Sequence, residues 1–577
     1  MRKTFGLCLL VVATGCVPES YDGLTGGEHP LVEDAALHAP RPLSPVSVSM
    51  VATSRPRFRW ELAQTTGAMV EMCRTRTCEG ETPKRFVSVG QELTVDKDLE
   101  PGMWFWRLRG LNDGHVGTDT SPTWQVLVRG PAKYGSSTTP TGAVLDIDGD
   151  GHPDMLASIF APDSDNGTHM FPWIALFHGR AEGTFTTDEA EITGTWSSSG
   201  EEYFSSADTA TVPAIAIAGG TDFNGDGFAD FSTAGMDVFP TSKGPLYAIT
   251  AEYGSAKGWT DMSDVLDVTG SVYPGVLASM TASGDVNGDG YGDLAVGGDD
   301  AGFVILGTKL GPAAQSVLFP SRDLSLAARP ILGAFDPDGD GFSEVAVATP
   351  AFGQGSSRHG GGSVMRASRS RLDPQVAGSA APLEGELTSE VALVARWTET
   401  SRTSAFHGLR PREAKSSAHP AARAFASGDF DGDGLADVAA SDTSGQVCFW
   451  FGHRERLLVP GPCTRGLPGD LELGSSITAV DLEGDGVDEL LVVAQKGDAH
   501  AIRTMRIEGE VVNVAEIPGT EGTGASLTTI WPGRPGKGRW AAALDDGRAI
   551  VVFEGSTRTQ RIEKPNGSGP RFGAALR

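Results

Sequence analysis

Residues 429–437 read DFDGDGLAD, which places four carboxylates and two glycines within nine residues. The same pattern returns five times, as DIDGDGHPD at 146–154, DFNGDGFAD at 222–230, DVNGDGYGD at 285–293, DPDGDGFSE at 336–344 and DLEGDGVDE at 481–489. Composition alone does not keep one spacing through six copies. This part of the chain is therefore built from repeated structural units.

Each nonapeptide has the donor pattern of a calcium loop. Carboxylate or amide oxygens stand at positions 1, 3 and 5, an acid stands at position 9, and glycine holds position 6, where a loop around a cation turns sharply. Position 7 varies freely, as expected where only a backbone carbonyl binds the ion. Magnesium suits the pattern less well because its small octahedral shell keeps several waters. We expect about six calcium ions, one in each loop.

The predicted ligands follow from these positions. They are Asp146, Asp148, Asp150, His152 and Asp154 in the first loop; Asp222, Asn224, Asp226, Phe228 and Asp230 in the second; Asp285, Asn287, Asp289, Tyr291 and Asp293 in the third; Asp336, Asp338, Asp340, Phe342 and Glu344 in the fourth; Asp429, Asp431, Asp433, Leu435 and Asp437 in the fifth; and Asp481, Glu483, Asp485, Val487 and Glu489 in the sixth.

Short apolar stretches flank every loop, and a third stretch further on often closes with glycine, as in FVILG at 303–307. This order predicts a four-stranded antiparallel sheet per repeat, the unit of a β-propeller blade. IVVFEG at 550–555 indicates a seventh unit, whose loop at 531–540 has Arg534, Lys537 and Arg539 where ligands would stand. FGAALR at 572–577 is expected to close the ring by pairing with the first or the last blade.

The loop D-x-[DN]-G-D-G-x-x-[DE] between β-strands, with FGQG at 352–355 and FGAAL at 572–576, resembles the FG-GAP repeats of integrin α-subunit propellers and their bacterial VCBS-type relatives. The resemblance covers residues 130–577 and implies a seven-bladed propeller that recognises a ligand on the face opposite its calcium loops. EF-hand and dockerin loops fit less well, because the flanks are strands and position 12 lacks the EF-hand glutamate.

Residues 41–129 lack the nonapeptide and read as strands, for example MWFWRLRGL at 103–111. Alternation places Trp104, Trp106 and Leu108 on one face and Phe105 and Arg107 on the other, as in a half-buried strand. The segment fits a small β-sandwich and resembles a fibronectin type III or immunoglobulin-like module. The predicted fold class is all-β, a β-sandwich followed by a seven-bladed propeller with calcium loops at 130–577.

The first sixteen residues, MRKTFGLCLLVVATGC, have a basic start and a short apolar stretch, which is typical of a secretory signal. VATGC resembles a bacterial lipobox, so Cys16 is expected to carry lipid and anchor an exported protein to the outer membrane or cell surface; ordinary cleavage with release is the alternative. Residues 17–40 read as a flexible tether. Export permits disulfides, and the close pairs Cys73 with Cys78 and Cys448 with Cys463 are expected to form them.

Charge and motifs limit the function. The net charge of −28 disfavours nucleic acid and anionic membrane as direct partners. No HExxH, GxSxG, Walker loop or Cys–His pair indicates catalysis. We therefore predict a non-enzymatic recognition, adhesion or scaffold protein that binds a protein or polysaccharide outside the cytoplasm through propeller loops. The alternative is a secreted or surface hydrolase or lyase of the polysaccharide-lyase or phospholipase kind.

Overall fold

The structure is a computed structural model of the chain. It describes residues 31–129, 140–162, 170–186, 191–194, 216–241, 244–266, 277–298, 302–312, 316–318, 332–339, 341–352, 359–365, 393–396, 422–442, 445–454, 457–533, 536–564, 572–573 and 576. Every helix or strand assigned within these ranges is a β-strand. In the described part, no helix has the length and apolar character needed to cross a membrane. The all-β prediction is confirmed.

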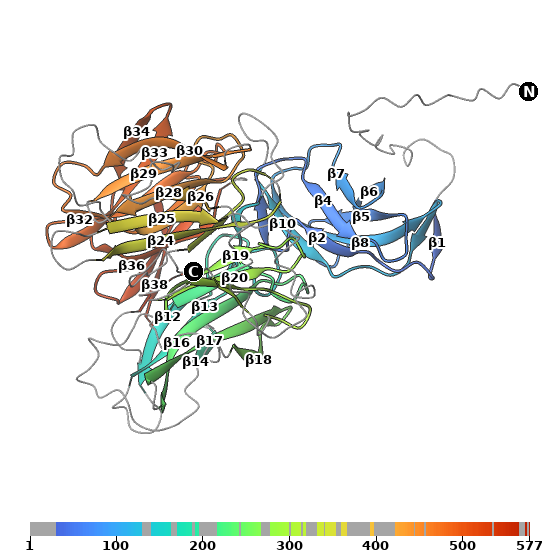
Figure 1. Cartoon of the computed structure of the whole chain (residues 1–577), viewed down its shortest axis with the longest axis horizontal. Coiled ribbons are helices and arrows are strands. Elements are labelled where there is room, and N and C mark those ends of the chain that lie inside the picture. Colours follow the sequence, from blue (N-terminus) through green and yellow to red (C-terminus); the bar gives the residue numbers. More distant parts are fainter. Residues whose placement is uncertain are drawn as a thin grey trace, which may run out of the picture.

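Two sheets form the N-terminal domain (Figure 1). The smaller sheet contains β2 (Arg41–Ser44), β4 (Arg57–Glu61) and β7 (Glu92–Thr94). The larger contains β1 (Val32–Asp34), β9 (His115–Gly117), β8 (Gly102–Asn112), β10 (Trp124–Val128), β3 (Ser49–Val51), β11 (Pro140–Ala143), β5 (Gly67–Cys73) and β6 (Lys84–Val89). Strands of both sheets contribute to one apolar core, in which the Trp106 ring meets Phe58 and Trp124 edge-on at centroid distances of 4.7 and 5.5 Å.

The boundaries of this domain differ from those expected from the sequence. Strand β1 lies inside 17–40, the expected tether, and pairs in parallel with β9. Strand β11 lies inside 130–577 but pairs with β3. Both segments lack apolar alternation of their own, so only the partner strand reveals them.

The two faces of β8 carry the expected residues, but the outer face is not exposed. Trp104, Trp106 and Leu108 lie in the domain core. Phe105 is only 1% exposed and belongs to a second apolar cluster that includes Trp531 of the repeat region. Because the repeats cover this face, the half-buried strand of the sequence prediction is buried on both sides at Phe105.

Seven antiparallel sheets follow in the described residues, each in sequence order. The first three are β12 (Met155–Pro162), β13 (Met170–Phe177) and β14 (Glu191–Gly194); β15 (Ala216–Thr221), β16 (Asp230–Thr241), β17 (Gly244–Ser255) and β18 (Gly258–Leu266); and β19 (Leu277–Gly284), β20 (Asp293–Gly298), β21 (Gly302–Ile305) and β22 (Ser316–Leu318).

The fourth and fifth sheets are β23 (Leu332–Phe335), β24 (Glu344–Phe352), β25 (His359–Met365) and β26 (Leu393–Arg396); and β27 (Ala422–Gly428), β28 (Asp437–Asp442), β29 (Gln446–His453) and β30 (Leu457–Arg465). The last two are β31 (Glu472–Val480), β32 (Glu489–Lys496), β33 (Ala499–Glu508) and β34 (Val511–Glu516); and β35 (Thr523–Trp531), β36 (Arg539–Leu544), β37 (Ala549–Glu554) and β38 (Thr557–Glu563).

The first strands of neighbouring sheets pack against one another, from β15 to β19, β23, β27, β31 and β35 in turn. This is the arrangement of propeller blades around a central axis. In the second to sixth sheets an acidic loop joins the first strand to the second, and in the last sheet 531–540 takes that place. The first sheet has no such first strand of its own, because β11 pairs with the N-terminal domain instead.

The C-terminal segment supplies the missing neighbour. Leu576 forms an antiparallel bridge to Ala157 in β12, and the amide of Gly573 donates to the carbonyl of Ser158 at 2.8 Å. Phe572 is fully buried in an apolar cluster shared by the first and last sheets. The expected closure by FGAALR is thus seen in its described residues, against the first sheet.

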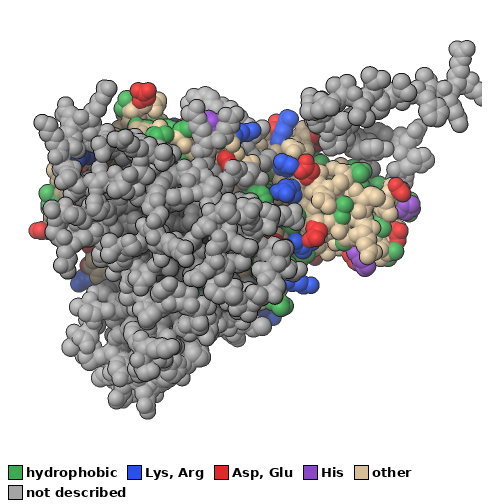
Figure 2. Space-filling view, viewed as in Figure 1, with side chains coloured by type: hydrophobic (Ala, Val, Ile, Leu, Met, Phe, Trp, Pro, Cys, Tyr) green, Lys and Arg blue, Asp and Glu red, His purple; other side chains and the backbone are tan. Residues whose placement is uncertain are grey.

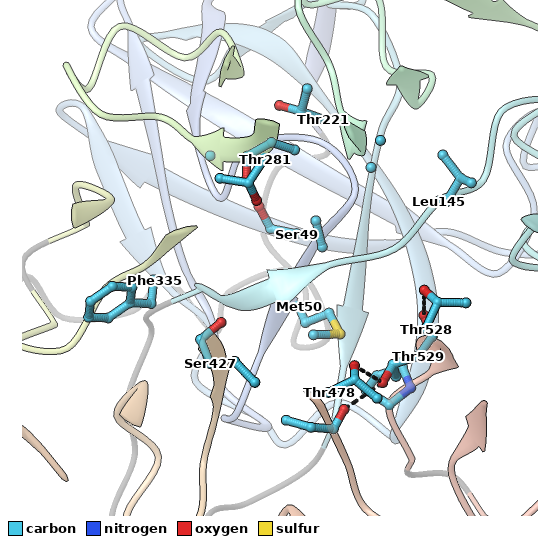
Figure 3. A pocket seen from close by; sticks show the side chains of 18 of the residues that line it. Ser49, Met50, Leu145, Thr221, Thr281, Phe335, Ser427, Thr478, Thr528 and Thr529 are labelled. Atoms are coloured by element: carbon cyan, nitrogen blue, oxygen red, sulfur yellow. Dashed lines mark hydrogen bonds between the residues drawn. The ribbon is translucent and has the colours of Figure 1, made fainter. Parts of the chain in front are cut away.

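The N-terminal domain also enters the centre of the ring. Residues 44–50 line a central cavity of about 250 Å³ together with first strands of several sheets. Figure 3 shows Ser49 and Met50 inside a surround of hydroxyl side chains that includes Thr221, Thr281 and Thr478. Strand β11 contacts β23 and β27 across the same space. The N-terminal domain and the repeat region therefore pack together at this central cavity.

Two disulfides connect the close cysteine pairs. Cys73 at the end of β5 is bonded to Cys78, with a Cα–Cα distance of 5.4 Å. Cys448 and Cys463 are directly opposite in the pair β29–β30 and are bonded across it. Each bond closes a short local stretch of chain, as expected of staples across turns.

Replacing Phe572 by alanine tests ring closure. Removing a fully buried aromatic ring costs about 3–5 kcal/mol, so Phe572→Ala should lower the denaturant midpoint and the melting temperature. The control is Leu471→Ala, because Leu471 is 68% exposed and its truncation should change little. Equal unfolding of both variants would show that the C-terminal segment contributes nothing to the ring.

Candidate metal centre

The six acidic loops share one hydrogen-bond pattern, which begins at position 1. In the second loop, Asp222 is buried and its carboxylate accepts the amides of Gly225 at 2.7 Å and Gly227 at 2.8 Å. These glycines have φ of 73° and 101°, where a side chain is strained. The carboxylates that accept both glycine amides in the same way are Asp285, Asp336, Asp429 and Asp481. Asp146 accepts the amides of Asp150 and Gly151.

In four of the loops, the carboxylate at position 9 connects the loop to the third strand of its own sheet. One oxygen of Asp230 accepts the amide of Phe223 at position 2, at 2.7 Å, and the other accepts the amide of Gly254 near the end of the third strand, at 2.9 Å. Asp154, Asp293 and Asp437 make the same two contacts. Each of these oxygens keeps a second lone pair, so the same carboxylate is able to bind a cation.

Position 1 also connects neighbouring loops. Its carbonyl accepts the amide at position 8 of the next loop, as Asp222 does from Gly292 at 2.7 Å. The contact recurs from Ala229 to Asp146, Ser343 to Asp285, Asp488 to Asp429 and Gly538 to Asp481. These contacts link the first four loops in one run and the fifth, sixth and seventh in another; we call the whole set the belt of acidic loops.

The carboxylates converge enough to hold a cation. One oxygen each of Asp146, Asp148 and Asp150 lie within 4.8 Å of one another, and so do those of Asp429, Asp431 and Asp437. Asp336, Asp338 and Glu344 converge equally in the fourth loop. Hard oxygen donors in this number fit Ca²⁺. Asp340 lies outside the described residues.

Position 7 has no common side-chain role. The amides of His152, Phe228, Tyr291, Leu435 and Val487 donate to the carboxylate at position 5 of the same loop. Binding of an ion by the carbonyl at position 7 stays a prediction.

Burial disfavours the ionised form of these acids. It raises the pKa of Asp222 to about 8 and that of Asp285 to about 7, and the neighbouring carboxylates Asp226 and Asp289 add to the shifts. The pKa of Asp230 is raised well above its ordinary value for the same reasons. A divalent cation removes this penalty because it neutralises the carboxylates together.

The first loop contains a histidine that the sequence reading missed. His178 Nδ1 lies 3.3 Å from Asp148 and 3.4 Å from Asp154. Hydrogen bonding to these two carboxylates raises the pKa of His178 to about 11. The residue stands directly before the glycine that closes the third stretch, and this position is the only sequence signal for it.

The N-terminal domain covers part of the loop face. The Arg76 guanidinium donates to the carbonyls of Gly149 in the first loop and Gly227 in the second, at 3.2 and 2.8 Å, and stacks on Phe228 at 3.9 Å. Trp124 donates to the carbonyl of Gly225 at 3.0 Å. Figure 2 shows Lys and Arg side chains gathered on this domain where it adjoins the repeats.

Two more arginines extend this contact. Arg41 donates to the carbonyl of Asp289 and lies over the ring of Tyr291 in the third loop. Arg129 is 3% exposed and forms a two-pronged ion pair with Asp488, at 2.6 and 2.9 Å. The sequence pattern of the N-terminal segment does not identify these arginines, because their partners are backbone groups and acids that belong to the repeat region.

The seventh loop has the opposite charge. Arg539 occupies position 9 and pairs in register with Glu554, and Lys537 lies 3.9 Å from Glu483 of the sixth loop. Arg534 lies outside the described residues. The described part of this loop thus has cationic side chains at these positions, and the loss of its metal site stays a prediction.

The metal-free protein should lose stability as pH rises from about 5 to about 8. The folded-state pKa values of Asp222 and Asp285, about 8 and about 7, exceed the ordinary 3.8, so the folded form holds extra protons. Their contribution is present at low pH and is lost as pH rises through the folded values. Calorimetry in chelator should show a falling melting temperature, and saturating calcium should flatten the curve. A melting temperature that rises with pH in chelator contradicts this account.

Part of the repeat region matches a known protein family. Residues 421–492 match the family described as FG-GAP-like repeat. This span includes the fifth and sixth acidic loops. No curated protein matches the chain at a significant level.

Solved structures give remote similarities. A protein from Lactobacillus plantarum has a TM-score of 0.35 at 8% identity, over 73% of this chain and 98% of its own. The Bacillus licheniformis rhamnogalacturonan lyase PL11 gives 0.27 at 12%, over 90% and 77%, and the Dos1 propeller 0.31 at 9%, over 90% and 94%. These similarities are too remote to indicate a function. The ring of sheets, the acidic loops and the matched segment identify the chain as a repeat protein of β-propeller fold with an FG-GAP-like repeat at 421–492.

Proposed function

We propose that this chain is a calcium-binding recognition or scaffold protein of the cell envelope. Its calcium ions hold the belt of acidic loops, and the opposite face of the propeller binds a protein or a polysaccharide. The observation that carries the proposal is the position of the N-terminal domain, which occupies the loop face through Arg41, Arg76 and Trp124. The opposite face is the one on which a partner has room.

The strand order supports this choice of face. Each acidic loop joins the first and second strands, so the turn between the second and third strands lies at the other end of the sheet. The sequence predicts long turns at this end of the sheets, at 159–172 and 234–245, and a blade-joining loop at 196–213 on the same side. In the second sheet, the structure has instead a long hairpin, β16 paired with β17, that extends through most of 234–245. A sheet extended at one end offers strand backbone and side chains to a partner. The expected loop at 196–213 lies outside the described residues.

The convergent carboxylates support calcium as a structural ion. Loops that confine three or four acids repel themselves without a cation. Their connection into a belt means that an ion in one loop also stabilises the next through the carbonyl at position 1. We propose that calcium makes the ring more rigid and takes no part in catalysis at the loops.

The envelope location is proposed from the amino terminus. Residues 1–30, including Cys16, lie outside the described residues, so the proposal rests on the signal and lipobox pattern. The two disulfides in the structure are compatible with an oxidising compartment.

Calcium titration is the central test. Chelator-treated protein should bind several ions with affinities of roughly 10⁻⁴ to 10⁻³ M and melt at higher temperature as calcium rises, by about 2.7 kcal/mol per site at a hundredfold excess over Kd. Magnesium should restore little. Replacing Asp429, Asp431 and Asp433 together by alanine should remove one ion, whereas Lys537→Ala in the seventh loop should remove none. Melting that ignores chelator would refute a structural role for calcium.

One binding assay distinguishes a recognition protein from an enzyme. The purified protein is incubated with a panel of envelope glycans, extracellular proteins and phospholipids, and both retention and cleavage products are measured. We expect retention without product release. Product release from any of these would favour the hydrolase or lyase alternative.

The lipid anchor has its own test. Cys16→Ser should move the protein from the membrane fraction to the soluble exported pool. Recovery of the unmodified sequence in the soluble pool would mean that the signal is cleaved without lipidation.

A further inference from the structure

The sixth acidic loop differs from the others where the second and third strands meet. The strand register places position 9 of each loop opposite a residue of the third strand. In the fifth sheet the register begins with Val438 opposite Trp450, and in the sixth with Leu490 opposite Met505; one residue earlier, Asp437 falls beside Phe451 and Glu489 beside Arg506. A cation thus stands beside the sixth loop where an aromatic ring stands beside the fifth.

The backbone differs at the same point. In the first, second, third and fifth loops, an oxygen of the position 9 aspartate accepts the amide of a glycine at or just beyond the end of the third strand; these are Gly179, Gly254, Gly307 and Gly452, at 2.8 to 2.9 Å. In the sixth unit Ile507 has this place and continues strand β33. The corresponding oxygen of Glu489 accepts instead from the Arg506 guanidinium.

The same guanidinium reaches a second carboxylate of the loop. Its other terminal nitrogen donates to Asp485, at position 5, at 2.5 Å. Arg506 thereby connects positions 5 and 9, two of the positions that a calcium ion connects in such a loop. A planar guanidinium suits this role because its donors are fixed and it is always charged.

The remaining acids of the sixth loop also have cations beside them. Arg129 of the N-terminal domain pairs with Asp488 and lies 3.8 Å from Asp481. Lys537 of the seventh loop lies 3.9 Å from Glu483. The second loop, in contrast, forms no ion pair at Asp222, Asp226 or Asp230 within the described residues, apart from the field of Arg76.

We infer that Arg506 takes the place of the metal ion in the sixth loop, which therefore holds its shape without calcium. The inference rests on the proposed calcium binding by the other loops and lowers the expected number of ions by one. A calcium ion entering this loop has to displace a guanidinium from two charge-assisted hydrogen bonds. In the fifth loop, within the part of the chain that the structure describes, position 9 accepts backbone amides and not a guanidinium.

A matched pair of substitutions at position 5 tests the inference. In the chelator-treated full-length protein, bound calcium per chain is counted by equilibrium dialysis at saturating calcium. Asp433→Ala in the fifth loop should lower the count by one. Asp485→Ala in the sixth should leave it unchanged. Loss of one ion in Asp485→Ala overturns the inference.

Exchanging the residues beside position 9 in the two loops should change the number of bound calcium ions in opposite directions. Arg506→Phe gives the sixth loop the residue of the fifth and should raise the count by one. Phe451→Arg should lower it by one, provided that circular dichroism shows a folded chain. An unchanged count in a folded Arg506→Phe protein also contradicts the inference.

Melting in chelator separates this inference from the calcium proposal. If Arg506 is the counter-ion of the sixth loop, Arg506→Phe should melt several degrees below the parent without metal, and Asp433→Ala should melt at or above it. Parent protein that binds no calcium refutes the calcium proposal alone, and the chelator melts still decide the role of Arg506. Equal melting of Arg506→Phe and parent in chelator refutes that role.

Discussion

The buried carboxylate at position 1 of each loop is the constraint on which the rest of the propeller depends. Asp222 and its counterparts lie inside the protein, and their carboxylates accept amides of their own loop. The backbone carbonyl of Asp222 also accepts an amide of the next loop. An ionised group in this position is costly unless hydrogen bonds and a cation compensate it. The loop amides meet the first need. His178 and Arg506 supply cationic side chains at the first and sixth loops, and calcium is the counter-ion that we propose.

This belt of loops explains why the N-terminal domain docks where it does. Arg76, Arg41 and Trp124 contact carbonyls of the first three loops, and these carbonyls point outward because the glycine turns aim the amides inward. The hydrogen bonds of these three residues to the loops therefore go to the loop backbone and not to the carboxylates. Arg129 is the exception, since it enters the ring and pairs with Asp488. Docking and loop order are thus physically connected.

Much of the repeat region was predictable from the sequence, for a local reason. Six copies of one nonapeptide, the strands beside them and the degenerate loop at 531–540 all depend on residues close in the chain. The alternation in β8 placed Trp104 and Trp106 correctly in the core. The closing segment was also recognisable, because Phe572 and Leu576 repeat the start of a blade.

Residue pattern by itself determined the strand periodicity, the glycine turns and the oxygen donors of each loop, because these follow from spacing within about ten residues. Tertiary structure alone decided which charges face these donors. Arg506 meets Asp485 and Glu489 through strand register, His178 meets Asp148 and Asp154 across a sheet, and Arg129 meets Asp488 from another domain. The same is true of β1 and β11, which are strands only because a distant partner supplies their hydrogen bonds. A buried charge is balanced in three dimensions, and the groups that balance it are far apart in the chain.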